Sequence, residues 1–195
     1  QTYTDLEIIV VDNASVDESC TLLAERYPDV RVIALDRNRG FTGACNAGFA
    51  AATGEYQALL NNDTEVDPNW VAEVVAAFER HPQAGMIASR MLLFDRRDTF
   101  HTAGDLFTRD GTPGNRGVWQ KDEGQFAEGE VFSANGGSAA YRRTMLEKVG
   151  RLDDDFFFSG EDVDLAWRAQ LAGWRAIYAP RAVVYHHLSA SGGGV

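Results

Sequence analysis

The sequence predicts one α/β domain in which a mostly parallel central sheet is flanked by helices. Its first 92 residues alternate between strand-like and helix-like patterns three times, and the connections between them are short. Such alternation favours parallel strands joined by right-handed crossovers. The length of 195 residues, with 45% hydrophobic and 24% charged residues, is ordinary for a single globular domain.

Apolar runs and apolar periodicity predict the elements of the first 92 residues. Leu6–Val11 has five apolar residues in six and predicts a short strand that is covered on both faces. Val71, Val74, Val75 and Phe78 recur at helical spacing and mark the buried face of a helix. Strands are expected at 6–11, 30–35, 56–60 and 85–92, and helices at 16–27, 42–53 and 67–78.

The pattern becomes irregular after Leu92. Residues 93–130 are rich in Gly, Asp, Arg and Thr but contain embedded aromatic residues, which indicates an excursion with short strands rather than a linker. We expect the aromatic run Phe156–Phe158 to anchor the following helix in the core. Extended segments are expected at 130–141, 175–178 and 182–185, and helices at 144–149 and 162–172. No domain boundary is indicated, so residues 1–195 are expected to form one domain with a regular half, 1–92, and an embellished half, 93–195.

Composition restricts the class of function. The chain has 18 basic and 29 acidic residues and a net charge of −11, which argues against nucleic acid and anionic membranes as partners. No apolar run approaches the roughly 18 residues of a membrane span, and no signal peptide is indicated. The two cysteines, Cys20 and Cys45, lie in helix-like segments. A disulfide framework is therefore excluded, and a reducing compartment such as the cytoplasm is favoured.

Polar side chains follow three successive predicted strands, in the segments 12–15, 36–40 and 61–64. Turn preferences alone could explain any one of these loops. The carboxyl ends of parallel strands, however, meet at one edge of a sheet, where such proteins bind ligands. In the third loop, Asn61, Asn62 and Asp63 supply hard oxygen atoms suited to Mg²⁺ or Mn²⁺, with Asp63 as the charged ligand.

Two further groups could carry chemistry. Glu161 and Asp162 open a predicted helix, whose dipole favours ionised carboxylates, so either could act as a general base. Acids are common in first helical turns, however, and this pair alone is a weak signal. His186 and His187 close the last apolar run. An imidazole beside carboxylate oxygens would favour Mn²⁺ over Ca²⁺.

Five ordered motifs carry a resemblance to a known family. They are Val10–Asp17; Asn38–Phe41 with Asn46 and Gly48; Leu59–Asp63; Gly160–Leu165 with Arg168 and Gly173; and His186. Together, from residue 6 to about residue 191, they resemble the family 2 inverting glycosyltransferases of the GT-A fold. The resemblance is greatest to rhamnosyltransferase-type members that build bacterial cell-surface polysaccharide.

The resemblance implies a role for each matching residue. Asp12, Asn13, Ser15, Asn38, Gly40, Asn46 and Asn62 would face the nucleotide; Asp63 and His186 would bind Mg²⁺ or Mn²⁺; Asp162, with Glu161 beside it, would deprotonate the acceptor; and Gly136 and Gly137 would line the cleft for the donor sugar and the acceptor. Residues 1–92 would then form the nucleotide-binding half, and residues 93–195 the acceptor and catalytic half.

The activity implied is transfer of a sugar, with rhamnose as the family-level expectation, from a nucleoside-diphosphate donor to a hydroxyl of a glycan or lipid-linked acceptor. It would take place in the cytoplasm, and any peripheral contact with the inner face of the membrane is expected from the missing regions. Asn61 departs from the family by replacing the first acid of the metal motif. The family's first strand and its C-terminal region are also expected to be missing, before Leu6 and after Ser191.

Competing functions differ in how well the residues exclude them. A dinucleotide-dependent oxidoreductase needs Gly-x-Gly-x-x-Gly after a strand, and a P-loop enzyme needs Gly-Lys-Ser/Thr; the sequence contains neither. A non-catalytic module that binds nucleotide sugars and a sugar nucleotidyltransferase both stay open as alternatives.

Overall fold

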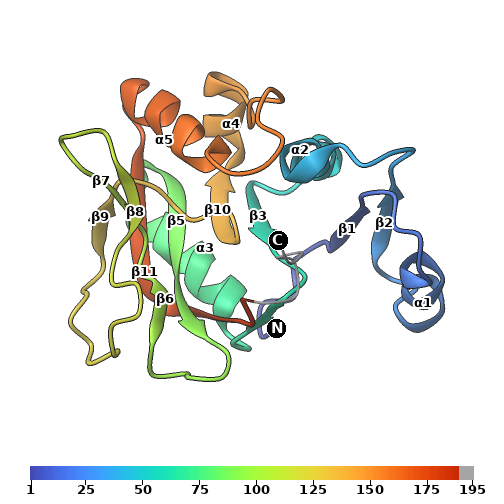
Figure 1. The fold of residues 1–195 in the computed structure, drawn as a ribbon, viewed down its shortest axis with the longest axis horizontal. Coiled ribbons are helices and arrows are strands. Elements are labelled where there is room, and N and C mark those ends of the chain that lie inside the picture. Colours follow the sequence, from blue (N-terminus) through green and yellow to red (C-terminus); the bar gives the residue numbers. More distant parts are fainter. Residues whose placement is uncertain (189–195) are drawn as a thin grey trace.

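The computed structural model describes residues 1–188, so the end of the resemblance near Ser191 lies outside the described residues. Its largest sheet has seven strands, with β3, β10, β5, β11 and β4 side by side in that order (Figure 1). These strands are β3 (Tyr56–Leu60), β10 (Ser138–Arg142), β5 (Ala84–Leu93), β11 (Arg175–His186) and β4 (Thr64–Val66). Two short strands complete the sheet: β6 (Phe100–Thr102) pairs with β5, and β9 (Gly129–Val131) pairs with β11.

The first fifty residues form a separate unit beside this sheet. Strands β1 (Ile9–Asp12) and β2 (Arg31–Ala34) pair in parallel, and helices α1 (Ser19–Arg26) and α2 (Gly40–Ala51) accompany them. In Figure 1 the strands β1 and β2 lie apart from the main sheet, and α2 lies between them and the helices above it. A third small sheet is the hairpin of β7 (Asp105–Phe107) and β8 (Pro113–Asn115).

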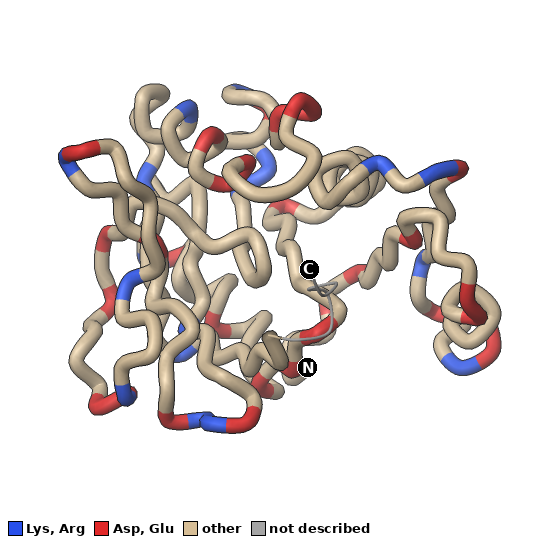
Figure 2. The backbone as a smooth tube through the Cα atoms, viewed as in Figure 1, with Lys and Arg blue, Asp and Glu red and all other residues tan. Residues whose placement is uncertain are grey.

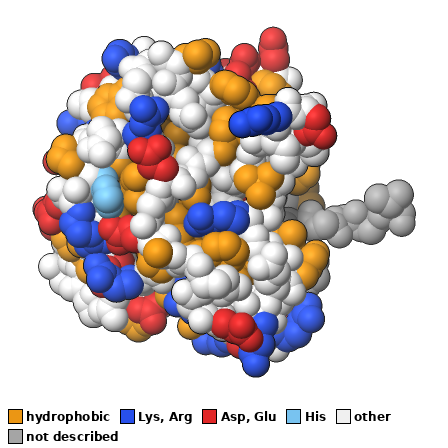
Figure 3. Space-filling model, turned by 90° about the vertical axis from the view of Figure 1, so that its left-hand side faces the viewer, with side chains coloured by type: hydrophobic (Ala, Val, Ile, Leu, Met, Phe, Trp, Pro, Cys, Tyr) orange, Lys and Arg blue, Asp and Glu red, His pale blue; other side chains and the backbone are white. Residues whose placement is uncertain are grey.

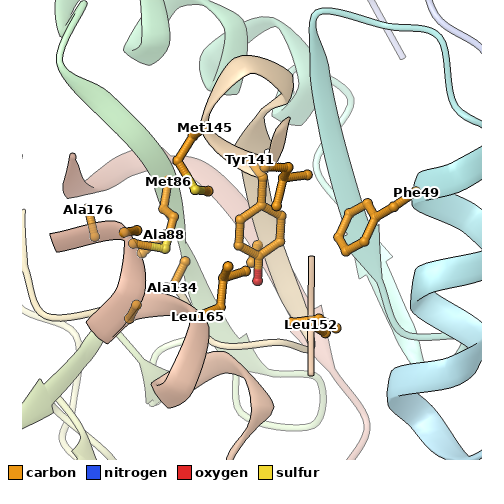
Figure 4. Close-up of a cluster of buried hydrophobic side chains, with 13 residues drawn as sticks. Phe49, Met86, Ala88, Ala134, Tyr141, Met145, Leu152, Leu165 and Ala176 are labelled. Carbon is orange, nitrogen blue, oxygen red and sulfur yellow. The ribbon is translucent and has the colours of Figure 1, made fainter. Parts of the chain in front are cut away.

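Helices cover both faces of the main sheet because successive side chains of a strand point in opposite directions. On β5, Met86 and Ala88 pack with α5 (Glu161–Leu171) and α4 (Arg143–Val149). Ile87, between them, packs on the other face with α3 (Trp70–Arg80). Figure 4 shows the first of these clusters, in which the ring of Tyr141 lies between Phe49 and Leu165.

The expectation of a mostly parallel sheet is wrong. In the seven-stranded sheet only β5 and β11 pair in parallel, and every other pairing is antiparallel among the described residues. The reason is that β10, from the second half of the chain, enters between β3 and β5. Alternation along a chain indicates connections but does not reveal which distant strand will insert between two neighbours.

Three smaller expectations also fail. The first strand is half-buried rather than covered on both faces, and Ile8 before it is 54% exposed, because β1 pairs only with β2 and packs on α2 within the described chain. The segments 175–178 and 182–185 are one strand, β11, with an irregularity between Ala179 and Val183. Strand β4 was not expected at all.

The surface carries both signs of charge. In Figure 2 acidic segments mark the loop before α5 and the start of that helix. On the face shown in Figure 3, basic and acidic side chains are interspersed rather than gathered into a basic stripe. Within residues 1–188, every helix is too short or too polar to pass through a lipid bilayer.

Candidate active site

The loops after β1 and β2 form a polar group that we call the nucleotide-side cluster: Asp12, Asn13, Ser15, Asn38 and Gly40. The side-chain nitrogen of Asn13 donates to Asn38 Oδ1 and to the carbonyl of Gly40, each at 3.0 Å. The backbone N–H of Ser15 donates to Asp12 Oδ2 at 3.2 Å. Hydrogen bonding from Ser15 lowers the pKa of Asp12, so this carboxylate is anionic at neutral pH. The structure therefore brings five of the predicted nucleotide residues together.

Gly40 is one point of close contact between the first fifty residues and the rest of the molecule. Its φ of +72° suits glycine, and a Cβ there would lie 2.4 Å from the carbonyl oxygen of Phe157. That carbonyl accepts a 2.9 Å hydrogen bond from the backbone of Phe41. The expectation that the aromatic run anchors α5 in the core is wrong for Phe157 and Phe158, which are 63% and 75% exposed. The backbone of this segment docks on the start of α2 and leaves those two rings outside.

Two predicted nucleotide residues lie elsewhere. The Asn46 side chain donates to the carbonyl of Leu152 at 2.8 Å and to Asp154 Oδ1 at 2.7 Å. It therefore holds the loop after α4, at the edge of a groove of about 680 Å³. Asn62 is exposed on the turn after β3, beside Asp63. Their contact with a nucleotide stays a prediction.

The two predicted metal ligands meet where β3 and β11 end. Strand β4, directly after Asp63, pairs with the end of β11, and the backbone N–H of His187 donates to the carbonyl of Asp63 at 2.9 Å. As a result Asp63 Oδ1 and His186 Nε2 are 3.1 Å apart, and both side chains are buried. Neighbouring ligands of an octahedral cation, each about 2.1 Å from the ion, lie about 3 Å apart.

This pair fits a divalent cation but would not enclose one. Among residues 1–188, no cluster of three or more His, Cys, Asp or Glu side chains is arranged to hold a metal. A cation here would therefore need further oxygen ligands from a bound molecule. His187 does not join the pair: it is exposed, and its ring stacks on Phe94 with a centroid separation of 3.6 Å.

His101 is a neighbour of this pair that the sequence did not single out. Its Nδ1 lies 3.0 Å from Nδ1 of His186, and the two rings stack. Burial, and secondarily the proximity of His186, lowers the pKa of His101 to about 4. His101 is therefore neutral at pH 7, and its Nδ1 can accept a hydrogen from Nδ1 of His186. In that tautomer His186 Nε2 would be free to bind a cation beside Asp63 Oδ1. The only available sequence signal was that the chain has just four histidines.

Asp162 is held at the start of α5 by backbone donors. The N–H of Gly136 donates to Asp162 Oδ2 at 3.1 Å, and that of Val163 donates to Oδ1 at 2.8 Å. A Cβ on Gly136 would lie 3.2 Å from Glu161 Oε1 and 3.6 Å from Asp162 Oδ2, so glycine permits this close approach. The carbonyl of Gly137 accepts from the N–H of Asn61 at 3.0 Å. Gly136 and Gly137 thus connect the predicted base to the loop that carries Asp63.

Glu161 faces the interior instead. It is 4% exposed, and its Oε2 has no hydrogen-bond partner within the described part of the chain. Burial raises its pKa, with a smaller contribution from Asp162. Of the two adjacent acids, Asp162 is the one that lines a cavity.

That cavity, which we call the base cavity, has a volume of about 230 Å³. Its wall includes Asp105, which sequence reasoning missed because a single acid in an irregular segment carries no recognisable signal. The residues that line it are Asp105, Pro113, Gly114, Asn115, Asn135, Ser159, Gly160, Asp162 and Val163. Burial, followed by the charge of Asp162, raises the pKa of Asp105 to about 7.

Comparisons with known proteins identify relatives of the chain. A succinoglycan biosynthesis protein, ExoO, of Rhizobium meliloti is 31% identical over 94% of the chain and 52% of its own length. An N-acetylglucosaminyl-diphospho-decaprenol L-rhamnosyltransferase of Mycobacterium tuberculosis is 26% identical over 98% of the chain and 70% of its own length. The chain therefore spans between about half and 70% of these two relatives.

The fold has a solved counterpart. The crystal structure of GalNAc-T7 with UDP, GalNAc and Mn²⁺ superimposes with a TM-score of 0.75 at 18% identity, over 92% of this chain and 37% of the other. This likeness confirms a GT-A-type fold, with a central sheet flanked by helices. The family model described as "Glycosyl transferase family 2" matches residues 1–150. The chain therefore belongs to glycosyl transferase family 2.

Proposed function

We propose that this chain is the catalytic region of an inverting glycosyltransferase that moves a sugar from a nucleoside diphosphate to a hydroxyl of a glycan or lipid-linked glycan. The observation that carries the proposal is the glycine pair Gly136–Gly137. It contacts the loop of Asp63 on one side and the carboxylate of Asp162 on the other. The glycine pair therefore links the candidate base to the loop that carries the candidate metal ligand Asp63.

Asp162 acts as the general base in the proposed reaction. Its two oxygens are oriented by backbone N–H groups and line the base cavity. The carboxylate takes the proton of the acceptor hydroxyl while the hydroxyl oxygen bonds to the anomeric carbon. The bond from that carbon to the phosphate oxygen breaks, and the nucleoside diphosphate leaves with the bonding electrons. Attack from the opposite face in one step inverts the configuration.

The remaining residues bind and orient the donor. The nucleotide-side cluster presents the Asp12 carboxylate and the Asn13 and Asn38 amides to the base and ribose. Asp63 and His186 would hold Mg²⁺ or Mn²⁺, which when bound offsets the negative charge of the diphosphate. Mn²⁺ is named for the GalNAc-T7 structure, and this supports a divalent metal here. Residues 1–92 then bind mainly the nucleotide, and residues 93–195 the acceptor.

Relatives indicate the substrate class. Similarity to the mycobacterial rhamnosyltransferase and to a succinoglycan biosynthesis protein supports a role in cell-surface polysaccharide synthesis. We infer that thymidine diphosphate-rhamnose is the first donor to test. A lipid-linked acceptor would place the enzyme in the cytoplasm, at the inner face of the membrane.

The decisive experiment is a panel of nucleoside-diphosphate sugars, measured for binding and turnover with and without Mn²⁺ on the full natural protein. Release of free nucleoside diphosphate that depends on Asp162 is expected. Release of pyrophosphate would instead indicate a sugar nucleotidyltransferase. Tight binding without turnover, in wild type and Asp162→Asn alike, would indicate a non-catalytic binding module.

A further inference from the structure

The base cavity contains a second carboxyl group for which the proposed reaction has no use. Asp105 and Asp162 both line this cavity, and Asp105 is 5% exposed. A buried carboxyl group is costly unless its environment satisfies it. The position of Asp105 beside the predicted base Asp162 therefore needs a functional explanation.

The fold holds Asp105 in one orientation. Its backbone N–H donates to the carbonyl of Ser133 at 3.0 Å, and its carbonyl accepts from the N–H of Phe132 at 3.0 Å. The Ser133 hydroxyl donates to Asp105 Oδ2 at 2.9 Å. The Thr102 hydroxyl lies 3.4 Å from Oδ1, which is long for a hydroxyl donor. Asn135 is a third side-chain hydrogen-bond partner of this carboxyl group. Because each carboxylate oxygen has two lone pairs, capacity remains for one further hydrogen bond to a ligand.

The surroundings keep Asp105 chemically different from Asp162. Two close carboxylates resist being ionised together, so one of them retains its proton more readily. Burial and the neighbouring Asp162 raise the pKa of Asp105 to about 7. At neutral pH this carboxyl group is protonated in about half of the molecules. A protonated carboxyl group can donate and accept, as a sugar hydroxyl does.

The cavity has the size and polarity for one sugar ring. Its volume of about 230 Å³ is below the roughly 300–1,000 Å³ of sites for drug-sized ligands. The side chains of Asn115 and Asn135 add amide groups to the same wall. Amide and carboxyl groups around a small cavity match the ring of hydroxyls on a monosaccharide unit.

We propose that Asp105 is a specificity-determining residue for the acceptor, and that it hydrogen-bonds the acceptor hydroxyl next to the one that Asp162 deprotonates. This rests on the proposed function, because it requires Asp162 to face an acceptor sugar. The hairpin of β7 and β8, which carries Asp105 and Asn115, then selects which ring is accepted.

The test compares two fates of the same donor: hydrolysis by water and transfer to methyl glycosides of glucose, galactose, mannose, rhamnose and N-acetylglucosamine. Asp105→Ala is expected to lower the ratio of transfer to hydrolysis about tenfold, as loss of one ligand hydrogen bond predicts. Asp105→Asn, which keeps a donor and an acceptor, should retain the ratio. Asp110→Ala, at the exposed turn of the same hairpin, is the matched control and should change neither rate.

Monodeoxy analogues of the best glycoside distinguish hydrogen bonding of the acceptor by Asp105 from a purely structural role of this residue. If Asp105 binds the neighbouring hydroxyl, wild type will disfavour the analogue that lacks it, and Asp105→Ala will not. Equal discrimination by wild type and Asp105→Ala would overturn the proposal. Should Asp105→Ala fail to fold, Asp105→Ser takes its place, because serine keeps a polar group at this buried position but is too short to reach the ligand.

The remaining outcomes are also decisive. If no glycoside is transferred and none inhibits hydrolysis, the base cavity does not take a sugar, and the role of Asp105 is refuted while Asp162-dependent hydrolysis still supports the proposed function. If wild type neither hydrolyses nor transfers any nucleoside-diphosphate sugar, the proposed function itself fails.

Discussion

The nucleotide-side cluster and the base cavity use similar residues but differ in burial, and within the cluster only Asp12 and Gly40 are buried. The cluster lies on a two-stranded sheet, and Ser15 and Asn38 are exposed while its amides bond one another. The candidate catalytic region adjoins the seven-stranded sheet and buries Asp63, His186, Asp105 and Glu161, of which Asp105 lies on the β7–β8 hairpin. Exposed polar loops can bind a large, charged nucleotide with little distortion of the protein. Proton transfer instead needs carboxyl groups whose pKa values are set by burial and by each other.

The largest expected effect is on the predicted base. Asp162→Asn cannot take a proton, and its amide oxygen can accept only one of the two backbone hydrogen bonds, so turnover should fall about 10²- to 10⁴-fold. Nucleotide affinity, measured by calorimetry, should stay near that of wild type because the cluster is untouched. Near-normal turnover of this variant would show that Asp162 is not the general base. The nucleotide-side cluster and the base cavity would then no longer differ in function as proposed.

Burial of Asp105 should appear as a pH dependence of stability. Its pKa rises from 3.8 to about 7 on folding, so the native state binds more protons than the unfolded state over that window. Stability is therefore lost as pH rises from about 4 to 7, by on the order of 4 kcal/mol in all. Urea unfolding at pH 5 and pH 8 should show this loss of stability in wild type, and Asp105→Asn should not show it. Asp110→Asn, exposed on the same hairpin, should show the wild-type slope.

Substitution of a predicted metal ligand, Asp63 or His186, should weaken binding of the donor and leave the fold of the nucleotide-side cluster unchanged. Asp63→Ala should weaken Mn²⁺-dependent affinity for a nucleoside-diphosphate sugar about 10- to 100-fold, in line with loss of a charged ligand. The control is Glu65→Ala, an exposed acid two residues along that pairs with Arg97. Unchanged affinity with and without Mn²⁺ in Asp63→Ala would sink the metal role.

One of the backbone contacts between the two regions can be disturbed by a single substitution. Gly40→Ala places a Cβ against the carbonyl of Phe157 at a φ of +72°, and we expect a loss of about 2 kcal/mol in the free energy of unfolding. Gly48→Ala is the matched change within the same helix, since its Cβ meets Val11 Cγ2 at 3.4 Å. Equal stability of both variants would show that the docking of the 157 segment on α2 is unimportant.

The smallest effect is expected within the cluster. Asn13→Ala removes bonds to Asn38 and Gly40 and should weaken nucleotide affinity by about 1 kcal/mol. Asn46→Ala should instead lower the free energy of unfolding, because Asn46 holds Leu152 and Asp154. If Asn46→Ala weakens nucleotide binding as much as Asn13→Ala does, the original prediction for Asn46 is right and its loop contacts are secondary.

Much of the local structure was readable from local patterns. The helices around Val74 and Leu165 and most strands follow from apolar spacing, which depends on a few adjacent residues. The motifs also singled out Asp63 and His186, which the structure brings together, and Asp162, which lines a cavity; their roles stay predictions. The order of the strands could not be predicted, because β10 pairs with strands that are distant along the chain. Its partner β3 lies some eighty residues away and its partner β5 about fifty.

The sequence by itself determined the family, the α/β class and the chemical types available at the strand ends, since these follow from composition, periodicity and motif order. Only the tertiary structure decided which acid faces a cavity: Asp162 is presented to it, while Glu161, one residue away, is buried. Only it brought His101 against His186 and Asp105 beside Asp162. The physical reason is that burial and close approach set the protonation of a carboxyl or imidazole group, and both arise from contacts between distant parts of the chain.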